Sequence, residues 1–439
     1  MTDTIASKLE TLVESNSDLV NWENAESQWK ERIESVIATN TLPSYLIYPH
    51  TPEALSEIVK CTHEHHWAIL PCGSGSKLNW GGLVKNIQLV ISTGHLNRII
   101  EHAVGDLTVT VETGVKLADL QNTLNQTGQF LPLDPAYPES ATVGGIVATA
   151  DSGSWRQRYG GVRDMLLGLS FVRADGQIAK AGGRVVKNVA GYDLMKLLAG
   201  SYGTLGIISQ VTLRVYPLPE TSVTVVLTGN KSAIATATQT AIASGLTPTA
   251  AEVLSASVVS RLGMGQGMGL IVRFQSIAAS VKEQSAQIES IGQQLGLQAG
   301  LYRDADQKQL WQRLQQIIGV PASASAITCK IGVMPAAAVT ILNQLDELTY
   351  KQGLGRINAS SGLGRLHLDS EEALSQIRKL RSLCQEHRGF LTVLEAPASF
   401  KQQLDPWGYT GNALEIMRKL KQQFDPESIL NPGRFVGGI

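Results

Sequence analysis

A glycine- and serine-rich loop directly after a short apolar segment constrains this chain more than any other feature. The apolar segment, Ala68–Leu70, predicts a buried strand, and the loop runs Pro71-Cys-Gly-Ser-Gly-Ser-Lys-Leu-Asn-Trp-Gly-Gly82. Glycines let consecutive backbone N–H groups turn toward one anion, and the serine hydroxyls and the lysine add further donors. An ordinary Gly/Ser turn would use the same residue types. As a pyrophosphate cradle, the loop would use Gly73, Ser74, Gly75, Ser76 and Lys77.

Three more glycine-rich segments follow. The segment Ala141–Ala150 would let the backbone lie flat against a ligand at Gly144 and Gly145, although a tightly packed buried helix also explains it. The segment Gly153–Gly161 contains arginines that would neutralise phosphates, and Gly200–Ile208 turns into an apolar strand. Four such turns in one region favour a long nucleotide that the backbone contacts at several points.

The signatures of several other nucleotide-binding and hydrolytic proteins are absent. The sequence contains no Gly-x-Gly-x-x-Gly fingerprint, no Gly-Lys pair of a Walker A loop and no Gly-x-Ser-x-Gly elbow. An NAD-type fingerprint, a P-loop and a nucleophile-elbow hydrolase therefore have no support.

Charge and cysteine usage exclude further classes. Lys and Arg number 37 against 38 Asp and Glu, so the chain lacks the positive field that nucleic acids or anionic membranes require. The 4 cysteines form no Cys-x-x-Cys pair, which speaks against zinc knuckles, iron–sulfur ligation and a disulfide scaffold. No signal peptide and no apolar run of the ~18 residues of a membrane span is evident, so a cytoplasmic location is expected.

The chain divides into four parts by its pattern of apolar segments. Residues 1–40 contain neither Gly nor Pro and predict an acidic helix, either a solvated surface helix or a segment that docks a partner. Residues 41–219 alternate predicted strands and helices, as an α/β domain does. Residues 220–411 suit a smaller α+β cap domain, and residues 412–439 form a tail.

Capping signals predict where two of the helices begin. Thr51 is suited to cap a helix that has Pro52 in its first turn. The helix of the tail is predicted to begin at Asn412, with Glu415 completing a capping box, and to stop at Asp425-Pro426.

The order of these segments and the amino-acid sequence of each resemble the flavin-binding domain of the vanillyl-alcohol oxidase / p-cresol methylhydroxylase superfamily. Within it, the chain is most similar to the D-lactate dehydrogenase and glycolate oxidase branch, and there to the FAD-binding E subunits of bacterial glycolate oxidase complexes. The resemblance implies an α+β protein: a two-part FAD-binding α/β domain, an α+β cap domain, and a C-terminal tail that returns to the flavin. It rests on residues 71–82, Gly105–Thr108, Leu133–Pro135, Ala141–Gly145, Arg158–Gly160, Lys187–Leu194, Gly203–Gly206 and Asn431–Gly433.

The resemblance also implies roles for the matching residues. Gly73 to Lys77 would hold the pyrophosphate of FAD. Some members tether FAD through a histidine in this loop, whereas Ser76 stands at that place here, so non-covalent binding is expected. The other implied FAD-binding residues are Pro135, Thr142, Gly144, Gly145, Gly153, Tyr159, Gly160, Ile207, Ile208 and Asn431.

The cap domain departs from the catalytic members of this branch. They carry a segment of the form His-Ala-Gly-Asp-Gly-Asn-Leu-His, where this chain has Ser360-Ser-Gly-Leu-Gly-Arg-Leu-His367. Ser360 replaces the first histidine and Leu363 the acid, so no metal site is expected there. His367 would act as a base or be merely structural, and Arg365 would clamp a carboxylate.

Three functions therefore stay open. In the first, the chain is the FAD-binding subunit of a glycolate oxidase complex and oxidises glycolate or D-lactate to the 2-oxo acid. In the second, it is a non-catalytic FAD-binding assembly or electron-transfer subunit; a free-standing D-lactate dehydrogenase is a third reading. The resemblance implies a related flavoprotein subunit and an iron–sulfur subunit as partners, with membrane association only through them.

Overall fold

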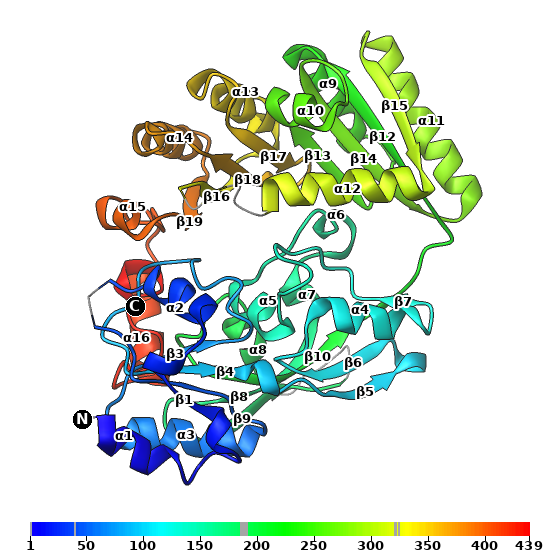
Figure 1. Cartoon of the computed structure of the whole chain (residues 1–439). Helices are drawn as coiled ribbons and strands as arrows, with labels where there is room; N and C mark the ends of the chain where they lie inside the picture. Colours follow the sequence, from blue (N-terminus) through cyan, green and yellow to red (C-terminus); the bar gives the residue numbers. More distant parts are fainter. Residues whose placement is uncertain (1, 39–40, 185–191, 320–322, 324) are drawn as a thin grey trace. The chain divides into compact units, whose positions relative to one another are not determined.

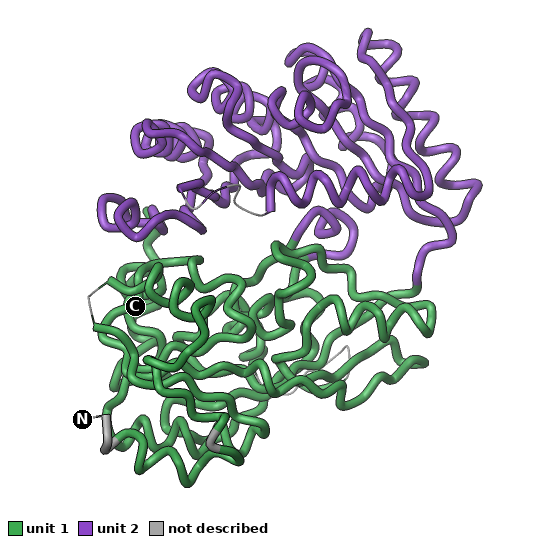
Figure 2. The backbone as a smooth tube through the Cα atoms, in the orientation of Figure 1, with its two compact units in different colours: residues 1–152, 161–217, 409–439 green, residues 153–160, 218–408 purple. Residues whose placement is uncertain are grey.

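The computed structural model describes residues 2–38, 41–184, 192–319, 323 and 325–439, which divide into two units (Figures 1 and 2). Unit 1 contains residues 1–152, 161–217 and 409–439; unit 2 contains residues 153–160 and 218–408. The C-terminal tail is thus part of the same unit as the N-terminal third of the chain. Of the segment Lys187–Leu194, residues 187–191 lie outside the described residues.

Unit 1 is built on two larger sheets and a two-stranded ribbon. The four-stranded sheet has the order β1-β2-β4-β3, in which β2, β4 and β3 are parallel and β1 is antiparallel to β2. The five-stranded sheet, β5-β6-β10-β8-β9, is antiparallel throughout. The strands are β1 (Leu19–Asn21), β2 (Tyr45–Ile47), β3 (Ile69–Cys72), β4 (Leu89–Ser92), β5 (Ile99–Ala103), β6 (Thr108–Glu112), β8 (Leu166–Val172), β9 (Ile178–Gly182) and β10 (Ile207–Arg214), with the ribbon of β7 (Gln129–Phe130) and β11 (Tyr216–Pro217).

Helices cover these sheets with apolar stripes. In α3 (Pro52–Glu64), Leu55, Ile58 and Val59 are buried, and the predicted cap is confirmed: the Thr51 hydroxyl accepts a hydrogen bond from the Ala54 N–H at 3.0 Å. The other helices of unit 1 are α1 (Thr2–Leu9), α2 (Ser27–Glu34), α4 (Leu117–Asn125), α5 (Val143–Thr149), α7 (Val162–Met165), α8 (Leu194–Leu198) and α16 (Leu414–Phe424), with the 3₁₀ turns η1 (Asn16–Asp18), η2 (Trp22–Asn24), η3 (Thr93–His95), η4 (Val104–Asp106) and η6 (Val436–Gly438).

The prediction of a single helix over residues 1–40 was wrong, because β1 separates α1 from α2. Short polar side chains explain the break. Asp18 accepts a hydrogen bond from the Ser15 N–H at 3.0 Å, and Asn21 accepts one from the Glu23 N–H at 2.9 Å. Such local bonds compete with the helical backbone pattern.

The predicted capping box of the last helix was also wrong. The helix begins at Leu414, its N-cap is Ala413, and no side chain caps it. The Ala413 N–H instead donates to the Tyr409 hydroxyl at 3.0 Å. Its predicted end is confirmed, since α16 stops at Phe424, just before Asp425.

Unit 2 is built on one antiparallel eight-stranded sheet of order β15-β12-β14-β13-β17-β18-β16-β19. Its strands are β12 (Thr221–Gly229), β13 (Ala250–Leu254), β14 (Met268–Ser276), β15 (Gln298–Arg303), β16 (Ile327–Gly332), β17 (Leu354–Asn358), β18 (Leu363–Leu368) and β19 (Phe390–Glu395). Its helices are α6 (Arg156–Tyr159), α9 (Lys231–Ala243), α10 (Ala256–Leu262), α11 (Ala278–Gln294), α12 (Asp304–Gly319), α13 (Ala338–Leu348), α14 (Ala373–Glu386) and α15 (Ala398–Gln403), with the 3₁₀ turn η5 (Pro335–Ala337).

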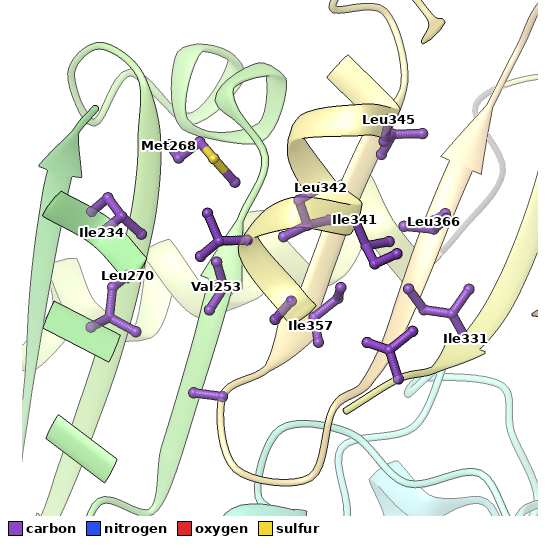
Figure 3. Packing of buried hydrophobic residues seen from close by; sticks show 14 of the residues in the cluster. Ile234, Val253, Met268, Leu270, Ile331, Ile341, Leu342, Leu345, Ile357 and Leu366 are labelled. Atoms are coloured by element: carbon purple, nitrogen blue, oxygen red, sulfur yellow. The ribbon is translucent and has the colours of Figure 1, made fainter. Parts of the chain in front are cut away.

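The two faces of this sheet differ in chemistry. Alternate residues such as Val253, Leu270 and Leu366 pack with α9, α11, α13 and α14 into the core of unit 2 (Figure 3). On the other face, α10 and α12 cover the apolar part near Ile271, while the strands β17, β18, β16 and β19 carry polar side chains there. Among the described residues, no helix combines the length and apolarity that crossing a membrane requires.

Candidate functional sites in each unit

A cavity in unit 1 lies where the end of β3, the start of α5, the start of β10 and the C-terminal tail meet. It is open to solvent on one side, and it is lined by backbone and side chains from all four segments. The predicted FAD-binding residues that line it are Gly73, Ser74, Gly75, Ser76, Lys77, Thr142, Gly144, Gly145, Ile207, Ile208 and Asn431.

Close packing requires glycine in the loop after β3. A Cβ at Gly73 would lie 2.1 Å from the Thr142 hydroxyl oxygen, and Gly75 has a φ of +76°, in the left-handed region. Side chains outside the loop hold its carbonyl groups: Ser92 donates to the Gly73 oxygen at 3.0 Å, and Arg32 donates to the Ser74 oxygen at 2.7 Å. The loop is therefore fixed in shape before any ligand binds.

Lys77 is anchored by an acidic partner. Its Nζ lies 3.2 Å from Asp151 Oδ2, and both side chains are buried. The same carboxylate oxygen accepts a hydrogen bond from the Ala136 N–H at 2.8 Å. Lys77 thus lines the cavity as half of an ion pair, which reduces the positive charge it offers a phosphate.

The C-terminal tail contributes two polar groups to the cavity. The Nδ2 group of Asn431 donates to the Tyr202 carbonyl at 2.6 Å, while its buried Oδ1 has no hydrogen-bond partner among the described residues. Arg434 was not predicted, although it directly follows the Asn431–Gly433 motif. Its guanidinium donates to the carbonyl groups of Leu78, Trp80 and Gly82 at 2.7–3.1 Å, and burial lowers its pKa to about 10.

A buried lysine holds the tail against the turn before β10. Lys421 Nζ lies 2.6 Å from Asp425 Oδ2 and donates to the carbonyl oxygens of Thr204 and Leu430 at 2.9 and 2.8 Å. Two wall segments of the cavity that are more than 200 residues apart in sequence are thereby joined.

The lining of the cavity is chemically suited to FAD. The glycine cradle lets an anionic pyrophosphate approach the backbone, and the unpartnered Asn431 Oδ1 would accept from a hydroxyl or ring N–H. Leu70, Ile207 and Ala148 offer apolar contact to a ring system. Burial raises the pKa of the Cys72 thiol to about 12, which keeps this cavity residue protonated and poorly reactive.

Four predicted FAD-binding residues lie elsewhere. Pro135 is in unit 1 but does not line the cavity. Gly153, Tyr159 and Gly160 belong to unit 2, around α6. Their FAD contacts remain predictions.

The polar face of the sheet in unit 2 places three cations in one cross-strand row. Arg356 on β17 is directly opposite Arg365 on β18, which is opposite Lys330 on β16. The two arginines are buried, with 7% and 8% of their surfaces exposed. Like charges opposite each other on one face repel, and buried acids or a bound anion can offset that repulsion. The acids Glu252 and Glu395 are buried in neighbouring strands.

His367 lies in the next row of the same face. It is opposite Thr328, whose hydroxyl oxygen is 3.3 Å from His367 Nδ1. Burial lowers the pKa of His367 below 6.5, so the imidazole is neutral near pH 7. A neutral imidazole has a free lone pair that can accept a proton.

Ser360 lies in the β17–β18 turn, and Leu363 is the first residue of β18. The Ser360 hydroxyl donates to Gln157 Oε1, and the Ser361 hydroxyl donates to Asn358 Oδ1 at 2.9 Å. The end of α3 carries another group of thiol and imidazole side chains, Cys61, His63, His65 and His66. Two of the imidazoles bond to different partners: His65 Nδ1 donates to the Cys61 carbonyl at 2.9 Å, and His66 Nδ1 is 3.1 Å from a Glu427 carboxylate oxygen.

Fold and cavity together define an FAD-binding flavoprotein. Residues 43–182 match the FAD binding domain, and residues 401–435 match the C-terminal domain of the FAD linked oxidases. The chain belongs to these FAD-linked oxidoreductases and has the α+β fold of the p-cresol methylhydroxylase type. It superposes on p-cresol methylhydroxylase with a TM-score of 0.77 at 14% identity, covering 98% of this chain and 96% of that one.

Curated relatives extend over nearly the whole chain. Mitochondrial D-lactate dehydrogenase (cytochrome) of Arabidopsis thaliana is 27% identical over 90% of this chain and 74% of its own length. Glycolate oxidase subunit GlcD of Bacillus subtilis is 27% identical over 90% and 89%. D-2-hydroxyglutarate dehydrogenase of Stutzerimonas stutzeri is 25% identical over 99% of both chains.

Proposed function

We propose that this protein oxidises a small 2-hydroxy acid, glycolate or D-lactate, to the 2-oxo acid with FAD as hydride acceptor. The observation that carries this proposal is the row formed by the buried Arg356 and Arg365 and the partly buried Lys330, which suits a carboxylate. The names of the curated relatives support the same substrate class, since all three refer to 2-hydroxy acids.

The residues of each unit supply part of this chemistry. In unit 1, Gly73 to Lys77, Asn431 and Arg434 would hold FAD, without a covalent tether because Ser76 lacks an imidazole. When bound, FAD supplies a two-electron acceptor for the hydride leaving the α-carbon. In unit 2, Arg365 would bind the carboxylate. With Nδ1–H donating to Thr328, Nε2 of His367 would accept the hydroxyl proton as the C=O bond forms.

A second function is favoured by the β17–β18 turn. Since Ser360 and Leu363 replace a histidine and an acid, the chain would be an FAD-binding assembly or electron-transfer subunit. Oxidation would then occur on a related flavoprotein subunit, and an iron–sulfur subunit would carry the electrons. Any attachment to a membrane would be through these partners.

Anaerobic visible spectroscopy of the purified FAD-loaded chain tests the proposal. We expect glycolate or D-lactate to bleach the spectrum of the oxidised flavin. The acid that reduces the flavin faster is the better substrate. A flavin spectrum unchanged by both acids would overturn independent oxidation and favour the subunit reading, which the same measurement with the partners present would then examine.

A further inference from the structure

Three side chains of unit 1 meet outside the FAD cavity: Asp18 at the end of η1, His50 after β2, and His95 at the end of η3. Asp18 Oδ1 is 2.8 Å from His50 Nε2, His50 Nε2 is 3.1 Å from His95 Nδ1, and His95 Nδ1 is 3.9 Å from Asp18 Oδ1. Two imidazoles and one carboxylate are the ligand types that zinc and related divalent ions take.

The spacing of the three atoms matches a metal site. A point equidistant from the corners of a triangle with these three sides lies about 2.0 Å from each corner. Zinc bonds to histidine nitrogen at ~2.0–2.1 Å and to carboxylate oxygen at ~2.0–2.2 Å. An ion at this point would reach all three ligand atoms but would lie in their plane. Side-chain rotations that even out the separations of 2.8 and 3.9 Å would convert the arrangement into a tetrahedral one.

The protons of neutral histidines do not satisfy this cluster. If His50 Nε2 carries a proton and donates it to Asp18, this nitrogen has no lone pair to accept a hydrogen bond from His95 Nδ1. If His95 Nδ1 instead donates to His50 Nε2, the Nε2 atom is unprotonated, and its lone pair lies 2.8 Å from a carboxylate oxygen that repels it. A cation at the centre converts both repulsions into ligand bonds.

Surrounding contacts orient the three ligands. Asp18 is buried, and its second oxygen accepts the Ser15 N–H at 3.0 Å, which leaves Oδ1 toward the histidines. The His95 ring stacks on Tyr48 with centroids 4.9 Å apart. Such supporting contacts accompany metal ligands in proteins. The histidine side chains are 38% and 44% exposed, so water has access for a fourth position.

We propose that Asp18, His50 and His95 bind one divalent ion of the zinc class, with water completing a tetrahedral site. The ion would connect Asp18, directly before β1, to the segments that follow β2 and β4. This role is structural and independent of the proposed oxidation.

Zinc titration of the full-length, FAD-loaded protein after chelator treatment tests this site. We expect one Zn²⁺ per chain and a rise in the unfolding temperature, with affinity reduced on the order of tenfold or more in His95→Gln. His66→Gln is the matched control, because that exposed histidine lies outside the cluster.

Three outcomes would overturn the site: no bound zinc, equal zinc affinity in the wild type and His95→Gln, or the same loss in His66→Gln. If His95→Gln fails to fold, His50→Gln replaces it. Cobalt(II) in place of zinc gives a second readout, since a tetrahedral site produces intense visible absorption that the ligand variants should lack.

Discussion

At the residue scale, Arg365 lies between two other cations. Its removal should therefore weaken substrate binding more than it lowers the free energy of unfolding. Arg365→Met relieves two like-charge contacts but also removes the other polar contacts of the guanidinium, so we expect the two effects to offset in part and the variant to fold. Loss of a charged hydrogen bond of about 1.5–3 kcal/mol should weaken glycolate or D-lactate binding on the order of 10–100-fold. Anaerobic flavin-reduction kinetics measure this. Arg303→Met, at an exposed position on β15, is the control, and equal effects in both variants would contradict the assignment.

The protonation of His367 should determine how the rate of flavin reduction falls at acid pH. Its pKa in the folded protein is below 6.5, so the neutral base predominates above that pKa and is lost as the pH falls through it. We expect the rate of flavin reduction to fall on the acid side with a midpoint below pH 6.5. His367→Gln keeps a group that can bond to Thr328 and should reduce the rate on the order of 10²–10⁴-fold while abolishing that limb. A variant with the wild-type rate would show that His367 is structural.

At the element scale, the loop after β3 should tolerate no added methyl group where it meets α5. Gly73→Ala would place a Cβ 2.1 Å from the Thr142 hydroxyl and displace the cradle or the start of α5. We expect a folded protein that loses FAD on gel filtration, measured by the ratio of flavin to protein absorbance. Gly105→Ala is the control, since a Cβ there meets nothing within 4 Å. FAD retained in Gly73→Ala would contradict the cradle.

The tail depends on the buried pair at the end of α16. Lys421→Met leaves Asp425 with the N–H groups of Ile429 and Leu430 as donors but without its cation. Removing one partner of a buried pair costs about 3–5 kcal/mol, so we expect a loss near the lower end and weaker FAD retention. Chemical denaturation measures the loss. Lys419→Met, on an exposed part of the same helix, should change stability by less than about 0.5 kcal/mol.

The sequence predicts those elements that are determined by residues close together along the chain. The strand before Gly73 and the cap at Thr51 follow from neighbouring residues. The row formed by Arg356, Arg365 and Lys330 does not, because it depends on the register of three strands rather than on spacing along the chain.

The same distinction explains what was missed in unit 1. Asp18, His50 and His95 are far apart in sequence and meet only because β1 pairs with β2 and β4 lies beside β2. Arg434 had a local signal, its place directly after Asn431–Gly433, but its three carbonyl partners lie more than 350 residues earlier.

At the scale of the whole molecule, each unit has its own hydrophobic core. The core of unit 2 lies between its eight-stranded sheet and helices that include α9 and α13. Unit 1 packs its parallel strands against α3 on one side and against α2 on the other. Because each unit has its own core, each can unfold in a separate transition.

Ligand binding should therefore act on the two cores unequally. The lining residues of the cavity all belong to unit 1, so FAD held there would stabilise unit 1 alone, unless the predicted contacts of Gly153, Tyr159 and Gly160 in unit 2 also form. A ligand at 100 times its dissociation constant stabilises the folded state by about 2.7 kcal/mol. We expect excess FAD to raise the midpoint of one of two transitions in differential scanning calorimetry of the apoprotein and to leave the other unchanged. Equal shifts of both transitions, or a single transition throughout, would mean that the units unfold together and that flavin binding also determines the stability of the sheet carrying Arg365 and His367.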